Sequence, residues 1–263
     1  MSAQPVHTGR ADPSVEPAWR RRFMAGALGL ACHGTFLVAV ASMFLGLHGG
    51  LALGRLRLTG AAGLASNVAL ALQFPLLHSF LLTRRGGEIL TRLLGARHGR
   101  ALAPTTYAWC AALQVLATFT LWSPSGTLWW EPHGAALVAM NAVYAFAWLF
   151  LGKALFDGGL GLQTGWIGWT AVWRGRRVQF PPLAQRGLFA LCRQPIYLGF
   201  ALTLWTGAVW TPDRLLLAAL WSTYCALGPL RKERRTLRQY GLAFELYQRR
   251  VPYMLPIRRR AAI

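Results

Sequence analysis

The sequence predicts an all-α, polytopic integral membrane protein, and three observations lead to this fold class. Of the 263 residues, 54% are hydrophobic, and 12 are tryptophans. The apolar residues fall into runs near the length of about 20 residues that a membrane-spanning helix needs. The formal net charge of +20 comes from arginines and lysines that lie between these runs instead of forming a separate basic domain. Anionic lipid headgroups are therefore the expected counter-charge, and nucleic acid is not expected as a partner.

Six apolar stretches predict about six transmembrane helices, at 23–47, 58–82, 106–122, 134–156, 196–210 and 215–230. The first is too long for a signal peptide and is expected to remain as a membrane anchor. The last two are separated by Thr211-Pro212-Asp213-Arg214, which predicts a tight polar turn. The C-terminal pair is therefore interpreted as a helical hairpin.

The distribution of positive charge predicts the orientation. All but three of the 28 lysines and arginines fall in segments that an alternating six-helix arrangement places on one side, and the exceptions are Arg55, Arg57 and Arg214. The positive-inside rule then places both termini in the cytoplasm, which fits a bacterial inner membrane. Residues 1–19 are polar and are expected to be disordered, whereas 20–263 are expected to form a single domain with a four-helix membrane part at 20–156.

Two further segments are expected to lie at the membrane surface. Residues 157–193 mix glycines, tryptophans and arginines, as is typical of chain lying along the interface. After the hairpin, a basic helix at 231–240 is expected to end at Gly241, and a second short helix at 242–249 is expected to stop before Val251-Pro252. Four cysteines lie far apart and show no metal-binding spacing, so no metal site is predicted.

The segment most informative about chemistry is Arg193-Gln194-Pro195-Ile196-Tyr197-Leu198-Gly199. Arg193 precedes a proline that begins a helix, and the free N–H groups of such a helix start, beside a cation, suit a carboxylate or a phosphate. Gly199 would let a ligand approach the backbone closely. The alternative interpretation is a plain interfacial anchor.

Glu233 is the only acidic residue in Arg231-Lys232-Glu233-Arg234-Arg235, and the predicted hairpin returns it to the face of Arg193. The carboxylate either neutralises the surrounding arginines or binds a cationic group of a ligand. Both side chains are expected at the rim of the protein, outside its core. Together they would suit a zwitterion.

These spaced residues resemble the isoprenylcysteine carboxyl methyltransferase and phospholipid methyltransferase superfamily. Its pattern is Arg-His-Pro-x-Tyr-x-Gly, a hairpin, Glu-Glu, and Gly-x-x-Tyr-x-x-Tyr-like spacing before Val-Pro. The matching elements here, within about 183–256, are the segment 193–199, Lys232-Glu233, Tyr240-Gly241, Phe244, Tyr247, Val251-Pro252 and Pro256.

The N-terminal half is similar to the bacterial methanethiol S-methyltransferase branch. This similarity rests on Gln73, His78-Ser79, Thr106-Tyr107 opening the third helix, and Leu121-Trp122-Ser123-Pro124 closing it. It favours a small thiol as the methyl acceptor.

The resemblance implies S-adenosyl-L-methionine as the methyl donor, held at the cytoplasmic ends of the last helices, with residues 157–256 as the cofactor-binding part. It implies a second opening toward the bilayer for an apolar acceptor. The implied cofactor-binding residues are Arg193, Gln194, Pro195, Tyr197, Gly199, Glu233 and Tyr247, and the implied catalytic residues are Arg193, Glu233, Tyr197 and His78. Arg193 would face the donor's carboxylate, Glu233 its ammonium, and the tyrosines its adenine or sulfonium.

Two residues depart from the superfamily pattern, because Gln194 replaces the histidine and Lys232 replaces the first glutamate. Glutamine forms hydrogen bonds but cannot change protonation near neutral pH, so no base is available at that position. The expected reaction is S-methylation of a small thiol such as methanethiol, with membrane lipids as surroundings. The alternatives are a methyltransferase for a prenylcysteine carboxylate or a lipid amine, and a non-enzymatic membrane factor or haem-associated transporter with the same fold.

Overall fold

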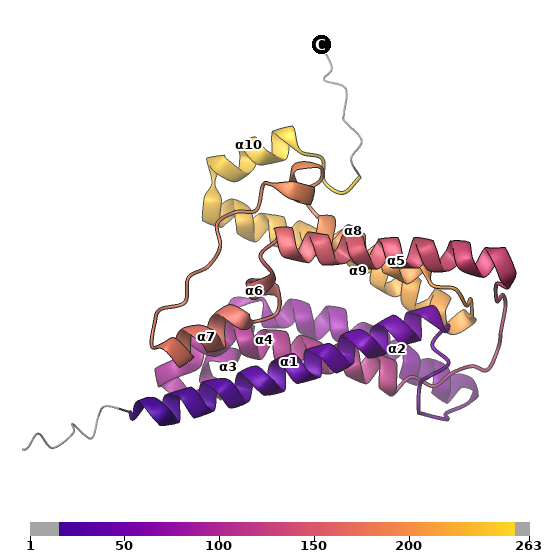
Figure 1. The fold of residues 1–263 in the computed structure, drawn as a ribbon, viewed down its shortest axis with the longest axis horizontal. Coiled ribbons are helices and arrows are strands. Elements are labelled where there is room, and N and C mark those ends of the chain that lie inside the picture. Colours follow the sequence, from indigo (N-terminus) through magenta and orange to yellow (C-terminus); the bar gives the residue numbers. More distant parts are fainter. Residues whose placement is uncertain (1–15, 256–263) are drawn as a thin grey trace, which may run out of the picture.

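A computed structural model describes residues 16–255 (Figure 1), so the predicted disorder at the start of the chain and the position of Pro256 lie largely outside the described residues. Over this range the chain is helical, which confirms the all-α prediction. The helices are α1 (Ala18–His48), α2 (Gly60–Leu81), α3 (Arg84–Leu93), α4 (Gly95–Thr120), α5 (Gly134–Asp157), α6 (Leu160–Gln163), α7 (Trp166–Arg174), the 3-10 helix η1 (Gly187–Ala190), α8 (Pro195–Thr206), α9 (Pro212–Tyr240) and α10 (Leu242–Arg250).

Three of these helices, α1, α2 and α5, are long and apolar enough to cross a membrane. Figure 1 shows α1 and α5 running along the long direction of the molecule, with α10 at the top of the view. Large apolar side chains such as Leu30, Leu37, Phe146 and Leu149 point outward and are mostly exposed. Such surfaces are stable in lipid and costly in water. The protein is therefore an integral membrane protein, and the number of six spans stays a prediction.

The helices pack in two groups that share one core. α1 packs mainly on α4 and α7, while α8 packs between α5 and α9. Gly29 of α1 permits the close contact with α7, because a Cβ atom there would lie 2.6 Å from the indole of Trp169. The main core is aromatic at its centre, with Phe119, Trp122 and Trp221 buried among leucines.

The segment 83–105, between the second and third predicted spans, is largely helical, although no helix is predicted there. Thr83 caps α3 by accepting a hydrogen bond from the backbone N–H of Gly86 at 3.2 Å, and Leu90 is buried. α4 then begins at Gly95, so Thr106 and Tyr107 lie inside this helix and do not open it. The reason is amphipathicity: α3 turns its arginines outward and buries Gly86 and Leu90, a pattern that long apolar runs do not reveal.

The last predicted span and the following basic helix form one continuous helix. α9 has 29 residues and is about 40 Å long, and Pro229 lies within it without ending it. Gly241 ends the helix at φ 50°, a left-handed conformation that favours glycine, and α10 follows with nearly the predicted bounds. The basic end of α9 is thus rigidly connected to its apolar part.

The predicted polar turn at 211–214 is buried, which is a second correction. Asp213 accepts hydrogen bonds from the indole N–H of Trp122 at 3.0 Å and from the backbone N–H and hydroxyl of Ser125 at 2.8 and 2.6 Å. The loop after α4 therefore folds over the start of α9. These partners lie about 90 positions away in the sequence, so local composition could not reveal them.

Arg214 is fully buried beside Asp213, and it closes the end of α8. Its guanidinium donates to the carbonyls of Leu204 at 3.1 Å, Gly207 at 2.6 Å and Val209 at 2.8 Å, and lies 4.1 Å from the ring centroid of Trp210. The last carbonyls of a helix have no intrahelical donor, and a cation there is favourable. Arg214 therefore caps α8.

Asp213→Ala should destabilise the protein by about 3 kcal/mol, because it leaves the buried indole N–H of Trp122 without its acceptor and removes two hydrogen bonds to Ser125. Thermal unfolding in detergent measures the effect as a drop of several degrees in Tm. Glu131→Ala, which removes an exposed carboxylate on the preceding loop, is the control. Equal Tm values for the two variants would contradict the structural role of Asp213.

Candidate functional site

Glu233 of α9 is the centre of a buried hydrogen-bond network and is 8% exposed. One carboxylate oxygen accepts from Arg193 Nε and Gln194 Nε2, both at 2.8 Å. The other accepts from Arg193 Nη2 at 3.2 Å and from Gln248 Nε2 at 2.8 Å. The prediction that the hairpin brings Arg193 and Glu233 together is confirmed. These four residues are called the Glu233 network below.

Arg193 fastens the C-terminal segment to this network. Its Nη1 donates to the carbonyls of Gln248 at 3.1 Å and Val251 at 2.6 Å, and its backbone N–H donates to the carbonyl of Pro252 at 2.9 Å. The side chains of Arg193 and Glu233 are 13% and 10% exposed, so their expected position at the rim is wrong. Contacts from α10 and from the chain after it cover the pair.

The hydrogen bonds keep the buried carboxylate ionised. Burial on its own raises the pKa of Glu233, but donors from Arg193, Gln194 and Gln248, together with the charge of Arg193, outweigh burial and hold the pKa below its usual range. A carboxylate that accepts four hydrogen bonds has filled its acceptor sites. In this arrangement Glu233 and Arg193 satisfy each other.

The positive charge of Lys232 is only partly compensated by its neighbours. Its Nζ donates to the side-chain oxygen of Gln194 at 3.2 Å and lies 5.6 Å from the ring centroid of Tyr197. No carboxylate lies within ion-pairing distance of it among residues 16–255. Burial lowers the pKa of Lys232 to about 8; Glu233 opposes this shift and Arg235 adds to it. An anionic ligand would supply the missing counter-charge.

An aromatic cluster continues the site toward α2 and α4, and its members are Phe74, His78, Tyr107, Tyr197 and Tyr224. Tyr224 lies 6.3 Å from Tyr197, 6.2 Å from Phe74 and 6.4 Å from His78, measured between ring centroids. Phe74 lies 4.8 Å from His78. The hydroxyl of Tyr107 lies 2.6 Å from Nε2 of His78. Four helices, α2, α4, α8 and α9, thus contribute side chains to one place.

Arg235 adds a positive charge to this cluster, since it interacts electrostatically with His78 and with the hydroxyls of Tyr107, Tyr197 and Tyr224. Sequence analysis did not single out Tyr224, Arg235 or Gln248. One signal was present: Tyr224 and Arg235 are eleven residues apart, close to three full turns of a helix, so a continuous α9 places them on one face. Predicting separate helices at 215–230 and 231–240 concealed this periodicity.

Three other residues predicted to bind the cofactor have structural contacts in the fold. Pro195 is the first residue of α8. The hydroxyl of Tyr247 donates to the carbonyl of Phe189 at 2.7 Å and so holds η1 against α10. A Cβ atom on Gly199 would lie 2.9 Å from the Cα atom of Leu151, so this glycine permits the close packing of α8 on α5.

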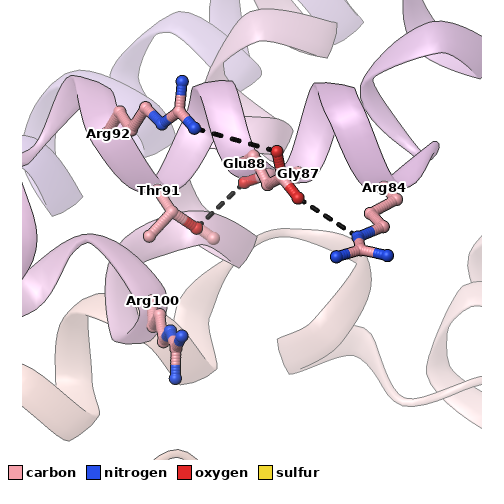
Figure 2. Close-up of a pocket in the computed structure, with 7 residues that line it drawn as sticks. Arg84, Gly87, Glu88, Thr91, Arg92 and Arg100 are labelled. Carbon is pink, nitrogen blue, oxygen red and sulfur yellow. Dashed lines mark hydrogen bonds and ion pairs between the residues drawn. The ribbon is translucent and has the colours of Figure 1, made fainter.

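A separate pocket of about 500 Å³ lies on the surface between α3 and α4 (Figure 2), and it is lined by Arg84, Gly87, Glu88, Thr91, Arg92, Arg100 and Ala103. Arg84 and Arg92 lie 3.2 and 3.9 Å from the carboxylate of Glu88, and their side chains are 93% and 80% exposed. Ion pairs this exposed contribute little, because water competes for them. None of the predicted site residues lines this pocket, so the Glu233 network and the aromatic cluster form the candidate site.

Comparison with known proteins finds similar proteins that match most of the chain. The chain is 27% identical over 253 residues to methanethiol S-methyltransferase 1 of Bradyrhizobium diazoefficiens, a match that covers 94% of this chain and 87% of that protein. The chain is thus similar to a methanethiol S-methyltransferase along nearly its whole length, in agreement with the resemblance seen in the sequence.

Two further relatives carry the same name. A Pseudomonas methanethiol S-methyltransferase is 28% identical over 163 residues, which cover 60% of this chain and 61% of that protein. The protein of that name from Crocosphaera subtropica is 22% identical over 187 residues, covering 70% of this chain and 71% of the relative. No family model and no solved structure matches the chain.

Glu233→Ala should lower the free energy of unfolding by about 3–5 kcal/mol, because it leaves the charge of Arg193 buried without its partner. Thermal unfolding in detergent measures this loss. Glu245→Ala removes an exposed carboxylate on α10 and is the matched control. A Tm for Glu233→Ala equal to that of the control would show that the network does not stabilise the fold.

Proposed function

We propose that this protein is an S-adenosyl-L-methionine-dependent membrane methyltransferase that transfers a methyl group to a small thiol such as methanethiol. The observation that carries the proposal is the similarity to a methanethiol S-methyltransferase along 94% of the chain. A buried site with cationic and aromatic side chains supports it independently, since methyl transfer from a sulfonium requires groups that hold a charged donor and exclude water.

The residues present fit the methyl donor in two respects. The donor's carboxylate needs a cation, and Lys232 is positively charged and forms no ion pair within residues 16–255. A sulfonium and an adenine both bind well to aromatic faces, which Tyr197 and Tyr224 supply. Lys232, Tyr197 and Tyr224 are therefore the residues proposed to hold the donor.

Arg193 and Glu233 are proposed as positioning residues in this arrangement. Their hydrogen bonds hold Gln194, which in turn orients the ammonium of Lys232. The roles implied by the resemblance, in which Arg193 binds the donor's carboxylate and Glu233 its ammonium, require some of these bonds to be exchanged for bonds to the donor.

When bound, S-adenosyl-L-methionine supplies an electrophilic methyl group on a positively charged sulfur. The chain contributes charge, orientation and a dry environment. The guanidinium of Arg235 favours the thiolate, which is the reactive form of a thiol. The aromatic cluster surrounds a small apolar acceptor, and holding the sulfur in line with the methyl group supplies the rest of the acceleration.

Calorimetric titration of the detergent-purified protein tests the proposal, with S-adenosyl-L-methionine and its demethylated product as ligands. We expect saturable binding of both, and conversion of methanethiol to its methyl thioether by the same preparation. Folded protein that binds neither ligand would support a non-enzymatic membrane factor instead.

Donor binding should weaken as the pH rises above about 8, because Lys232 then loses the charge that attracts the carboxylate. The affinity should fall by up to about tenfold per pH unit in that range. Lys232→Met should bind more weakly at neutral pH and show no such fall, whereas Arg234→Met, which removes an exposed cation two positions further along α9, should behave as wild type. A fall above pH 8 that persists in Lys232→Met would contradict this role.

A further inference from the structure

We infer that His78 accepts the proton of the thiol, and that the acceptor thiol therefore binds at Nδ1 of His78, within the aromatic cluster. This inference rests on the proposed function. It assigns the proton acceptor that Gln194, in place of the superfamily's histidine, cannot provide.

The two ring nitrogens of His78 are in different situations. Nε2 is hydrogen-bonded to the hydroxyl of Tyr107 at 2.6 Å. Nδ1 is buried and has no hydrogen-bond partner in the part of the chain that the structure describes. An unpaired buried polar atom costs about 1–3 kcal/mol, so a ligand that bonds to it removes this cost. If Nε2–H donates to Tyr107, Nδ1 carries the lone pair that a thiol can use.

The surroundings of His78 suit a small apolar molecule with one polar hydrogen. Phe74 lies beside the imidazole on α2, and Tyr224 faces it from α9 at 6.4 Å between ring centroids. The titratable and charged groups that face His78 are Tyr107 from α4, and Tyr224 and Arg235 from α9. The carboxylate of Glu233 is engaged in its own network and does not compete for the proton.

Arg235 contributes a positive charge that favours an anion beside His78. Once the thiol sulfur becomes negative, it is stabilised both by Arg235 and by the new imidazolium. The cluster therefore favours ionisation of the thiol only within the site.

The reaction balances as follows. The S–H bond breaks and its proton goes to Nδ1 of His78. The electron pair left on sulfur forms a new bond to the donor's methyl carbon, while the bond from that carbon to the sulfonium breaks and its electron pair stays on the donor sulfur. The thioether and the demethylated donor leave with no charge on either sulfur, and His78 then releases its proton to water.

Comparison of two acceptors of equal size tests this role. An alkaneselenol is already ionised near neutral pH, so it needs no proton acceptor, whereas the alkanethiol of the same chain length does. His78→Gln should lower kcat for methanethiol about 100-fold and kcat for methaneselenol by no more than about threefold, with donor binding unchanged. An equal loss for both acceptors, or no loss for the thiol, would overturn the inference.

Tyr107→Phe provides a second variant that keeps the ring packing and the histidine. It removes the hydrogen bond to Nε2, so the pH at which thiol turnover is half-maximal should shift, while selenol turnover should keep its wild-type pH profile. Identical shifts for both acceptors would overturn the role of the pair. If the wild type does not bind the donor, the proposed function itself is refuted. Failure of the proposed function and failure of the inference about His78 therefore give different results.

Discussion

The rest of the C-terminal half depends on one buried carboxylate. Glu233 lies where α8 begins, where the basic part of α9 passes and where α10 folds back, and it is bonded to each of these elements. A buried charge is tolerated only when partners compensate for its lost hydration. The requirement to satisfy Glu233 therefore fixes the relative positions of three helices, and with them the orientation of Lys232.

The α8–α9 hairpin is fixed at its other end by a second pair of buried charges. Asp213 binds the loop after α4, and Arg214 caps α8. Between these two anchors the facing surfaces carry Tyr197 and Tyr224, so the aromatic cluster stands on helices held at both ends. Side chains held on rigid elements lose little entropy when a ligand binds, which favours a preorganised site.

Features that depend on apolar periodicity and spacing were predicted from the sequence, whereas features that depend on tertiary contacts were not. The spans at α1, α2 and α5 and the meeting of Arg193 with Glu233 followed from apolar runs and from the geometry of a hairpin. The continuity of α9 through Pro229 and the burial of Asp213 did not, because each depends on partners remote in sequence. A charge such as Arg214 looks solvated in a local window even when carbonyls surround it in the fold.

The two departures from the superfamily pattern act as one change. The amide of Gln194 donates to Glu233 and accepts from Lys232, so it bridges an anion and a cation that neighbour each other in sequence. A glutamate at 232 would offer no donor to the amide oxygen, and a neutral histidine at 194 could bridge both in only one tautomer. The combination leaves the site more positive and removes any titrating base from position 194. The proposed methyl transfer to a thiol therefore needs another proton acceptor, and His78 is the imidazole that the fold places beside the same tyrosines.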